Sequence, residues 1–207
     1  MVPPTLGAVP GPGDEDLIEH LRAGDEDAFV NLVNRYHASM LRVASTFVPS
    51  RAVAEEVVQD TWLGVIRGLP RFEGRSSLKT WIFRILVNRA RTTGVREPRT
   101  VELDTGDGLD RGRFTVDGSW REPPIVWTDD IEDRLAAPEM AAKIQDLVAQ
   151  LPESQRQVVT LRDIEGLSSR EVCDLLGLSE GNQRVLLHRG RTRVRAMLED
   201  DVKGWEK

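Results

Sequence analysis

The chain has 207 residues, 40% of them hydrophobic, and a formal net charge of −6, which is typical of a globular protein with one ordinary domain or two small ones. No uncharged apolar run approaches the roughly 18 residues of a spanning helix, and the N-terminus lacks a secretory pattern, so we expect no membrane insertion and a cytoplasmic location. One cysteine and three scattered histidines argue against a disulfide framework or a zinc site, so we expect no metal and no cofactor.

The charge is distributed unevenly along the chain. Residues 1–95 carry 11 bases and 11 acids, residues 138–207 carry 11 and 12, and residues 96–137 carry 6 and 11. Two stretches are nevertheless basic: residues 71–96 have seven bases and one acid, and residues 184–195 have five arginines and no acid. Local basic stretches of this kind favour contact with a polyanion, because phosphate attraction acts over short distances at physiological salt.

The N-terminal part of the chain is predicted to be helical after a short tail. Residues 1–13 contain four prolines and three glycines, a composition that predicts a disordered tail. Apolar residues then recur at helical spacing through residues 14–95. Asp25 and Ser50 stand where the second and third helices would begin, and Pro49 ends the second. Residues 76–95 form a fourth predicted helix, so residues 14–95 are expected to make one small helical domain.

The middle of the chain separates two helical regions. Residues 96–137 lose periodicity and are rich in acids, which predicts a long flexible linker. Helical spacing resumes at Pro138 and predicts four further helices within residues 138–207. No segment alternates apolar and polar residues for long enough to propose a sheet. The predicted fold class is therefore all-α, with two small helical domains joined by a long flexible acidic linker.

The last two predicted helices have the layout of a helix-turn-helix. Ser168 is a candidate cap, Gly177 a candidate turn and Ser179 a second cap before an arginine-rich helix. On that last helix Arg184 and His188 share one side with Arg191 and Arg195, while apolar residues occupy another. This side can meet phosphates and base edges. The alternative is a solvated basic helix in an interaction domain.

The basic stretch of residues 71–96 also contains aromatic residues. Phe72, Trp81 and Phe83 alternate with five bases, a mixture suited to single-stranded DNA, because cations follow the backbone while aromatic faces hold unstacked bases. Asn88 carries a donor and an acceptor on one planar amide, which suits it to reading a base edge. The alternative for Trp81 and Phe83 is a place in the core.

Three segments together resemble the extracytoplasmic-function (ECF) sigma factors of bacterial RNA polymerase. They are AFVNLVNRYHASMLRVA, AEEVVQDTWLGVIRGLPRFEGRSSLKTWIFRILVNRAR and LPESQRQVVTLRDIEGLSSREVCDLLGLSEGNQRVLLHRGRTRVR. The resemblance extends from about residue 14 to residue 197 and keeps the order and separation of the segments. It implies a protein that binds core RNA polymerase, directs it to specific promoters and promotes promoter melting. It also implies an anti-sigma factor as a further partner.

The resemblance assigns a role to each matching position. Residues 14–95 match sigma domain 2 and residues 138–207 match sigma domain 4. The implied contacts with core polymerase are Glu56, Gln59 and Asp60. The implied contacts with the melted minus-ten strand are Phe72, Ser76, Lys79, Trp81, Arg84, Asn88 and Arg89. The implied contacts with the minus-thirty-five duplex are Arg162, Gln183, Arg184, Val185, His188 and Arg189.

The chain departs from the family pattern at the start of the last helix. Gln183, Val185 and Leu186 replace residue types that are common in relatives, so the promoter sequence does not follow from the resemblance. The linker matches the connector that threads toward the polymerase active-site cleft, where its acids could imitate nucleic acid. A solvated tether accounts for the acidic composition equally well. Trp120 and Trp127 are candidate anchors on the polymerase.

The sequence disfavours two other classes of function. An enzyme is disfavoured because the sequence has no phosphate-binding glycine loop, no paired carboxylates and no Cys with a partnered His. Cys173 is instead predicted to be a small buried residue. A stand-alone transcriptional regulator also has a C-terminal helix-turn-helix, but the basic, aromatic unit of residues 71–96 has no use in a protein that binds only duplex DNA.

Overall fold

The structure is a computed structural model that describes residues 14–94 and 138–205. Every regular element in these ranges is helical, which confirms the all-α prediction. The predicted tail, residues 1–13, and the predicted linker, residues 96–137, lie outside the described residues.

The described helices fall into two halves of the chain. The N-terminal half contains α1 (Asp14–Arg22), α2 (Glu26–Ala44), α3 (Arg51–Gly68), the short 3₁₀ turn η1 (Leu69–Arg71) and α4 (Leu78–Gly94). The C-terminal half contains α7 (Pro138–Ala149), α8 (Glu153–Val159), the π-helical turn η2 (Thr160–Ile164), α9 (Ser169–Leu176) and α10 (Glu180–Trp205).

Side-chain caps fix where the N-terminal helices begin. The Asp25 carboxylate accepts hydrogen bonds from the backbone N–H groups of Asp27 (2.9 Å) and Ala28 (3.1 Å) at the start of α2. The Ser50 hydroxyl accepts one from Val53 at 3.3 Å at the start of α3. Each bond satisfies a backbone donor that has no partner inside the helix. Both caps confirm the starts predicted from the sequence.

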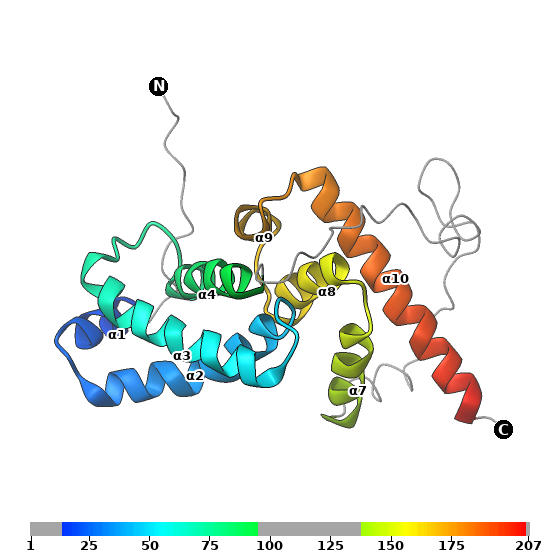
Figure 1. Cartoon of the computed structure of the whole chain (residues 1–207), viewed down its shortest axis with the longest axis horizontal. Coiled ribbons are helices and arrows are strands. Elements are labelled where there is room, and N and C mark those ends of the chain that lie inside the picture. Colours follow the sequence, from blue (N-terminus) through cyan, green and yellow to red (C-terminus); the bar gives the residue numbers. More distant parts are fainter. Residues whose placement is uncertain (1–13, 95–137, 206–207) are drawn as a thin grey trace.

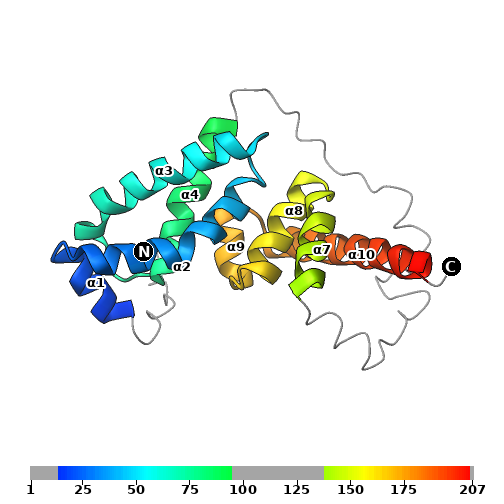
Figure 2. The same cartoon turned by 90° about the horizontal axis from the view of Figure 1, so that it is seen from below.

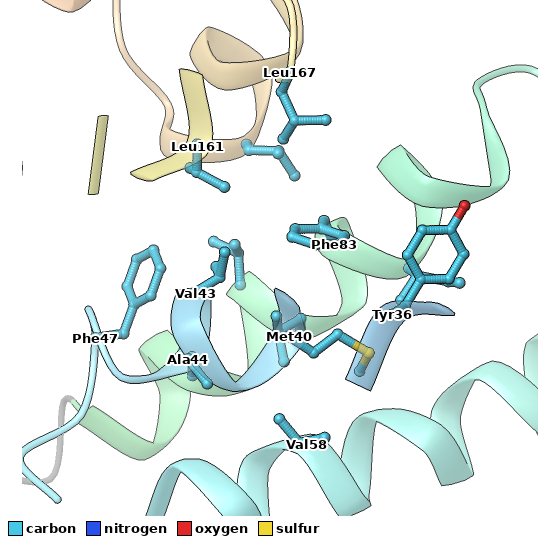
Figure 3. Packing of buried hydrophobic residues seen from close by; sticks show 14 of the residues in the cluster. Tyr36, Met40, Val43, Ala44, Phe47, Val58, Phe83, Leu161 and Leu167 are labelled. Atoms are coloured by element: carbon cyan, nitrogen blue, oxygen red, sulfur yellow. The ribbon is translucent and has the colours of Figure 1, made fainter. Parts of the chain in front are cut away.

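Helix α2 lies at the centre of the N-terminal half. It packs against α1, α3 and α4, and its residues Leu32, Met40 and Val43 are 0% exposed. In the close view, Met40 and Ala44 lie between α2 and Val58 of α3 (Figure 3). This arrangement leaves one side of α3 and one side of α4 on the surface.

The C-terminal half contains the predicted helix-turn-helix. Ser168 and Glu171 form a reciprocal capping box at the start of α9, and the Ser179 hydroxyl accepts from the backbone N–H of Asn182 at 3.2 Å in the first turn of α10. Gly177, between the two helices, has a φ of 68°, a left-handed conformation that side-chain-bearing residues avoid. The two caps and the glycine therefore set the angle at which α10 leaves α9.

One predicted helix is interrupted in the structure. The sequence predicts a continuous helix over residues 152–166, but after α8 the backbone widens into a π-helical turn. There the N–H of Glu165 donates to the carbonyl of Thr160, five residues earlier, at 2.9 Å. Gly166 then takes a φ of 70° and ends the helix. This turn directs Glu165 toward the N-terminal half.

The two halves contact each other directly. Helix α9 packs on α4, and η2 packs on α2; Figures 1 and 2 show α8 and α9 beside the N-terminal helices, while α10 extends away from them. One cluster of buried apolar side chains runs through both halves, and Figure 3 shows Leu161 and Leu167 facing Val43 and Phe83. The sequence predicted two domains, but it did not predict this packing between them.

Candidate nucleic-acid interface

Helix α10 presents an exposed basic face at its N-terminal end. Arg184 and His188, one turn apart, are both exposed, and Val185 beside them is 47% exposed. The opposite side of the helix carries Leu186 and Leu187, which are buried. This end of α10 therefore has a packed side and an exposed side that carries Arg184 and His188.

Three other residues assigned to the same duplex surface lie closer to the protein interior. Gln183 is only 3% exposed, and its Oε1 accepts a hydrogen bond from the Ser169 hydroxyl at 2.8 Å. Arg162 lies in η2 and donates to the backbone carbonyl of Leu167. Arg189 is half-buried. In this structure Gln183 thus connects α10 to α9, and Arg162 connects η2 to the segment just before α9.

A bidentate ion pair links the middle of α10 to η2. Arg191 donates from Nε and Nη2 to the two carboxylate oxygens of Asp163, at 2.8 and 2.6 Å. These hydrogen bonds raise the pKa of Arg191 further above its usual value, with a smaller opposing effect from burial. Arg195 pairs with Glu199 along the same helix at 3.1 Å. The basic side predicted for residues 184–195 is therefore exposed at its start and paired with acids further along.

Helix α4 exposes two of the residues that the resemblance assigns to the melted minus-ten strand. Arg84 and Asn88 are exposed and lie four residues apart, so they share one side of the helix. Trp81 precedes them on the same side and is half-buried. This side combines a cation, an amide and an aromatic ring, which are the groups that a single-stranded nucleic acid requires.

The aromatic residues near this surface are largely part of the core. Phe72 is 5% exposed and packs on Trp81 with 4.9 Å between the ring centroids. The Trp81 ring lies so close to Gly68 that a Cβ placed there would be 2.9 Å from it. Phe83 is 0% exposed. The structure therefore favours the core alternative for Phe83 and leaves Trp81 partly accessible. It also buries Phe72, for which the sequence suggested no place in the core.

The remaining residues of the minus-ten set are engaged within the protein. Ser76 is half-buried and donates to the Ser77 carbonyl at 3.4 Å. Lys79 is paired with Glu165 of the C-terminal half, with 3.5 Å between its Nζ and a carboxylate oxygen. Arg89 pairs with Asp60 of α3 at 3.3 Å. Two of the predicted DNA-binding cations thus already have carboxylate partners.

The exposed side of α3 carries the residues assigned to polymerase binding. Glu56, Gln59 and Asp60 are all exposed and lie on one side of the helix. Leu63 and Ile66 continue this stripe, and each is 50% exposed. Sequence reasoning missed these two residues, although an apolar residue on the polar side of an amphipathic helix is a recognisable signal.

Within residues 14–94 and 138–205, no group of three or more metal-ligating side chains comes together. None of the helices that the structure describes is long and apolar enough to cross a membrane. Cys173 is buried in α9, and burial, with smaller effects from Glu180 and Asp174, raises the pKa of its thiol. A thiol that stays protonated is a weak nucleophile, which fits the predicted packing role.

The two exposed surfaces together define a class of protein. A helix-turn-helix with an exposed basic start, together with a separate basic and aromatic helix surface, is the arrangement of a helical DNA-binding protein with two contact surfaces. The comparisons agree. Residues 32–96 match the family Sigma-70 region 2, and residues 141–194 match Sigma-70 region 4.

Relatives of known name match over most of their length. The ECF RNA polymerase sigma-E factor of Salmonella typhimurium is 30% identical over 181 residues, which cover 87% of this chain and 92% of the relative. The protein of the same name from Escherichia coli strain K12 has the same identity and coverage. The chain therefore belongs to the ECF sigma factors of the sigma-70 family, the factors that direct RNA polymerase to specific promoters at the start of transcription.

Two solved structures share the fold. CnrH, in complex with the cytosolic domain of CnrY, superposes with a TM-score of 0.56 and 24% identity, over 92% of this chain and 99% of CnrH. The sigma factor RpoE from Bartonella quintana, in complex with the anti-sigma factor NepR, superposes with a TM-score of 0.52 and 22% identity, over 82% of this chain and 97% of RpoE.

Proposed function

We propose that the chain divides promoter recognition between three surfaces. The exposed start of α10 reads the minus-thirty-five duplex, the Arg84 and Asn88 side of α4 holds the melted minus-ten strand, and the exposed side of α3 docks on core polymerase. The observation that carries this proposal is the exposure of Arg184 and Asn88 on two helices of different halves, each above a packed side. The protein acts in the cytoplasm, where its polymerase is, and it catalyses no reaction of its own.

The α3 surface has the composition of a docking surface. Its acids, Glu56 and Asp60, suit a basic partner surface and guide its approach. Leu63 and Ile66 add apolar area, which is what stabilises most protein interfaces once water is excluded. We propose that these four positions, with Gln59, bind the core enzyme together. An anti-sigma factor is a further proposed partner, and it is supported by the structural neighbour RpoE, which was solved in complex with the anti-sigma factor NepR.

In vitro transcription with core polymerase separates the two DNA surfaces. A promoter selected with the wild-type chain is supplied either as intact duplex or with the minus-ten region already mismatched. Arg184→Ala removes a base or phosphate contact in the duplex and is expected to lower run-off transcription about 5- to 100-fold on both templates, as for the loss of one specific contact. Asn88→Ala is expected to lower run-off transcription on the intact duplex. This defect should be smaller on the mismatched template, because binding of the base no longer has to offset the free-energy cost of opening the strands.

The controls test docking separately from DNA recognition. Asn34→Ala removes an exposed amide from α2 and is expected to leave transcription unchanged on both templates. Gln59→Arg places a cation on the α3 docking surface and is expected to abolish co-elution with core polymerase, whereas Asn88→Ala co-elutes normally. Equal defects of Asn88→Ala on both templates, or co-elution of Gln59→Arg, would contradict the assignments. Tight sequence-specific binding by the isolated chain would instead favour a stand-alone regulator.

A further inference from the structure

Val185 is an apolar side chain in the middle of the exposed side of α10. Its exposed fraction is 47%. The packed side of these first turns is made by Gln183, Leu186, Leu187 and Gly190, all of which are buried. At about 100° per residue, the middle of that packed side lies roughly 150° around the helix from Val185. The Val185 side chain therefore projects almost directly away from the protein.

The fold itself gives no reason for a valine at this position. A β-branched side chain is a poorer helix former than alanine, and Val185 leaves about half of its surface in water. In the part of the C-terminal half that the structure describes, no other large apolar side chain is exposed to this degree. A partner that covers Val185 accounts for both properties.

The neighbours of Val185 indicate what kind of partner this is. Arg184 and His188 are exposed on one side of it, and Asn182 is exposed on the other. Protein-docking surfaces have several apolar residues at their centre, whereas here a single valine lies among polar groups. Arginine and asparagine side chains pair with guanine and adenine in the major groove of DNA, and in the same groove thymine presents a methyl group to apolar side chains. The surface therefore fits base edges of a duplex.

Contacts on the packed side fix the direction in which Val185 points. Before it, the Ser169 hydroxyl of α9 donates to Oε1 of Gln183 at 2.8 Å. After it, Gly190 lies so close to α8 that a Cβ there would be 2.5 Å from Cγ2 of Val159. These two contacts hold the roll of α10 about its own axis. A side chain presented by a fixed helix loses little freedom on binding, which favours discrimination between similar bases.

We propose that Val185 reads a thymine of the minus-thirty-five element by covering its 5-methyl group. This inference rests on the proposed function, in which the start of α10 enters the major groove of that duplex. The family resemblance leaves the promoter sequence open here, because Val185 replaces a residue type that is common in relatives. The chemistry of the valine side chain then assigns one base of that sequence.

Replacement of single thymines by deoxyuridine tests the inference, because deoxyuridine lacks only the 5-methyl group. A promoter is selected from a library randomised in the minus-thirty-five element, with holoenzyme assembled from core polymerase and the full wild-type chain. Each thymine of the selected element is then replaced in turn, and the affinity of the holoenzyme for the fluorescein-labelled duplex is measured by fluorescence anisotropy. One replacement is expected to lower the affinity of the wild-type holoenzyme about 3- to 5-fold, as for the loss of one buried methyl group.

Three variants show whether Val185 causes this preference. Val185→Ser removes the apolar surface and is expected to bind the thymine and deoxyuridine duplexes with equal affinity. Val30→Ser changes a valine of α2 that is 54% exposed, and it is expected to keep the wild-type ratio. Arg184→Ala is expected to weaken binding to both duplexes and to leave their ratio unchanged.

Two results would overturn the inference. One is a preference for thymine over deoxyuridine that persists undiminished in Val185→Ser. The other is a selected element in which no thymine replacement lowers the affinity of the wild-type holoenzyme. Failure of the proposed function gives a different result, because Arg184→Ala holoenzyme would then bind the selected promoter as tightly as the wild type.

Discussion

Glu171 shows how one side chain can stabilise two levels of structure. Its carboxylate accepts from the backbone N–H of Ser168 at 2.8 Å, which completes the capping box of α9, and it accepts from the Thr80 hydroxyl of the other half. Burial acts to raise the pKa of this carboxyl, but hydrogen bonds from Ser168 and Thr80 and the charge of Lys79 outweigh it and hold the pKa below the usual 4.5. The ionised form is therefore the one that stabilises the fold.

The depressed pKa of Glu171 predicts a dependence of stability on acid. Its contribution is complete above the unfolded-state value of about 4.5 and is lost as the pH falls through the lower folded-state pKa. Glu171→Gln keeps an acceptor for the capping box but does not titrate. We expect its melting temperature to fall less than that of the wild type between about pH 5 and pH 3. Thermal melts followed by circular dichroism measure this difference.

A second variant separates titration from capping. Glu171→Ala loses both and is expected to melt at a lower temperature than Glu171→Gln even at neutral pH, since a lost cap costs about 1 kcal/mol. Melting curves of Glu171→Gln and the wild type that fall in parallel with pH would contradict the assignment.

At the residue scale, the sequence predicted helix caps and turns correctly. It did not predict which polar side chains are buried. Asp25, Ser50, Ser168 and Gly177 act where they were predicted, because a cap or a left-handed turn depends on chemistry within a few residues of chain. Gln183 lies at the start of a predicted recognition helix, yet its amide faces Ser169 in the interior. That orientation depends on how α10 rolls against α9, which no short-range signal records.

Helices α8 and α10 cross at Gly190, where only a hydrogen side chain fits. A Cβ at this position would lie 2.5 Å from Cγ2 of Val159, well inside a normal contact. Helix α10 also packs on α7 and α9, so it cannot move away from α8 without disturbing the helix-turn-helix. The glycine therefore sets the spacing between the scaffold and the recognition helix.

Replacing Gly190 by alanine is expected to lower the stability of the protein, even though alanine has the better helix propensity. Gly190→Ala gains up to about 1 kcal/mol of intrinsic preference, but it forces a shift that typically costs about 1–3 kcal/mol. We expect a lower free energy of unfolding in urea. Gly181→Ala is the control, because its Cβ would meet nothing within 4 Å, and it should be neutral or stabilising. A stabilised Gly190→Ala would show that α10 adjusts freely.

At the element scale, periodicity predicted the helices but not every break. Eight α-helices are described, four on either side of residues 95–137. The π-helical turn η2 was missed, because its residues Thr160–Ile164 keep a helical pattern of apolar side chains. Leu161 in this turn and Leu167 just after it face Val43 of α2 and Phe83 of α4, which lie far away in the sequence.

The whole molecule is held together by a core that crosses between its halves. Leu161 is 0% exposed and belongs to the same buried cluster as Val43 and Phe83. Such continuity predicts that the halves unfold together. We expect one calorimetric transition whose enthalpy agrees with the van't Hoff value.

Truncating the shared core should uncouple the halves. Leu161→Ala is expected to lower stability by about 2–5 kcal/mol and to split or broaden the transition, since the contact between the halves is weakened along with the C-terminal core. Val58→Ala, buried between α2 and α3 within one half, is the matched comparison and should lower the melting temperature without splitting the transition. Two separate transitions in the wild type would contradict a shared core.

The sequence could not predict the contact between the two halves, because this contact depends on residues about 80 to 120 positions apart in the chain. Arg42 and Glu165 illustrate the point: each reads as an ordinary charged residue on a helix or turn, and only the fold brings them together. The helix-turn-helix and the basic, aromatic unit, by contrast, are contiguous in the chain, which is why their presence could be predicted while their mutual contact could not.

The ion pair between Asp60 and Arg89 has a consequence for genetics. The two side chains are 59% and 35% exposed, and a pair this accessible contributes only about 0–1 kcal/mol, yet it joins the helix proposed to meet the polymerase to the helix proposed to meet the promoter. Alanine substitution of Asp60 or Arg89 would therefore affect polymerase binding and promoter binding together, since removing either side chain changes the orientation of the other. Alleles at Asp60 and Arg89 are informative only as a pair, and single alleles elsewhere on α3 or α4 give the cleaner map.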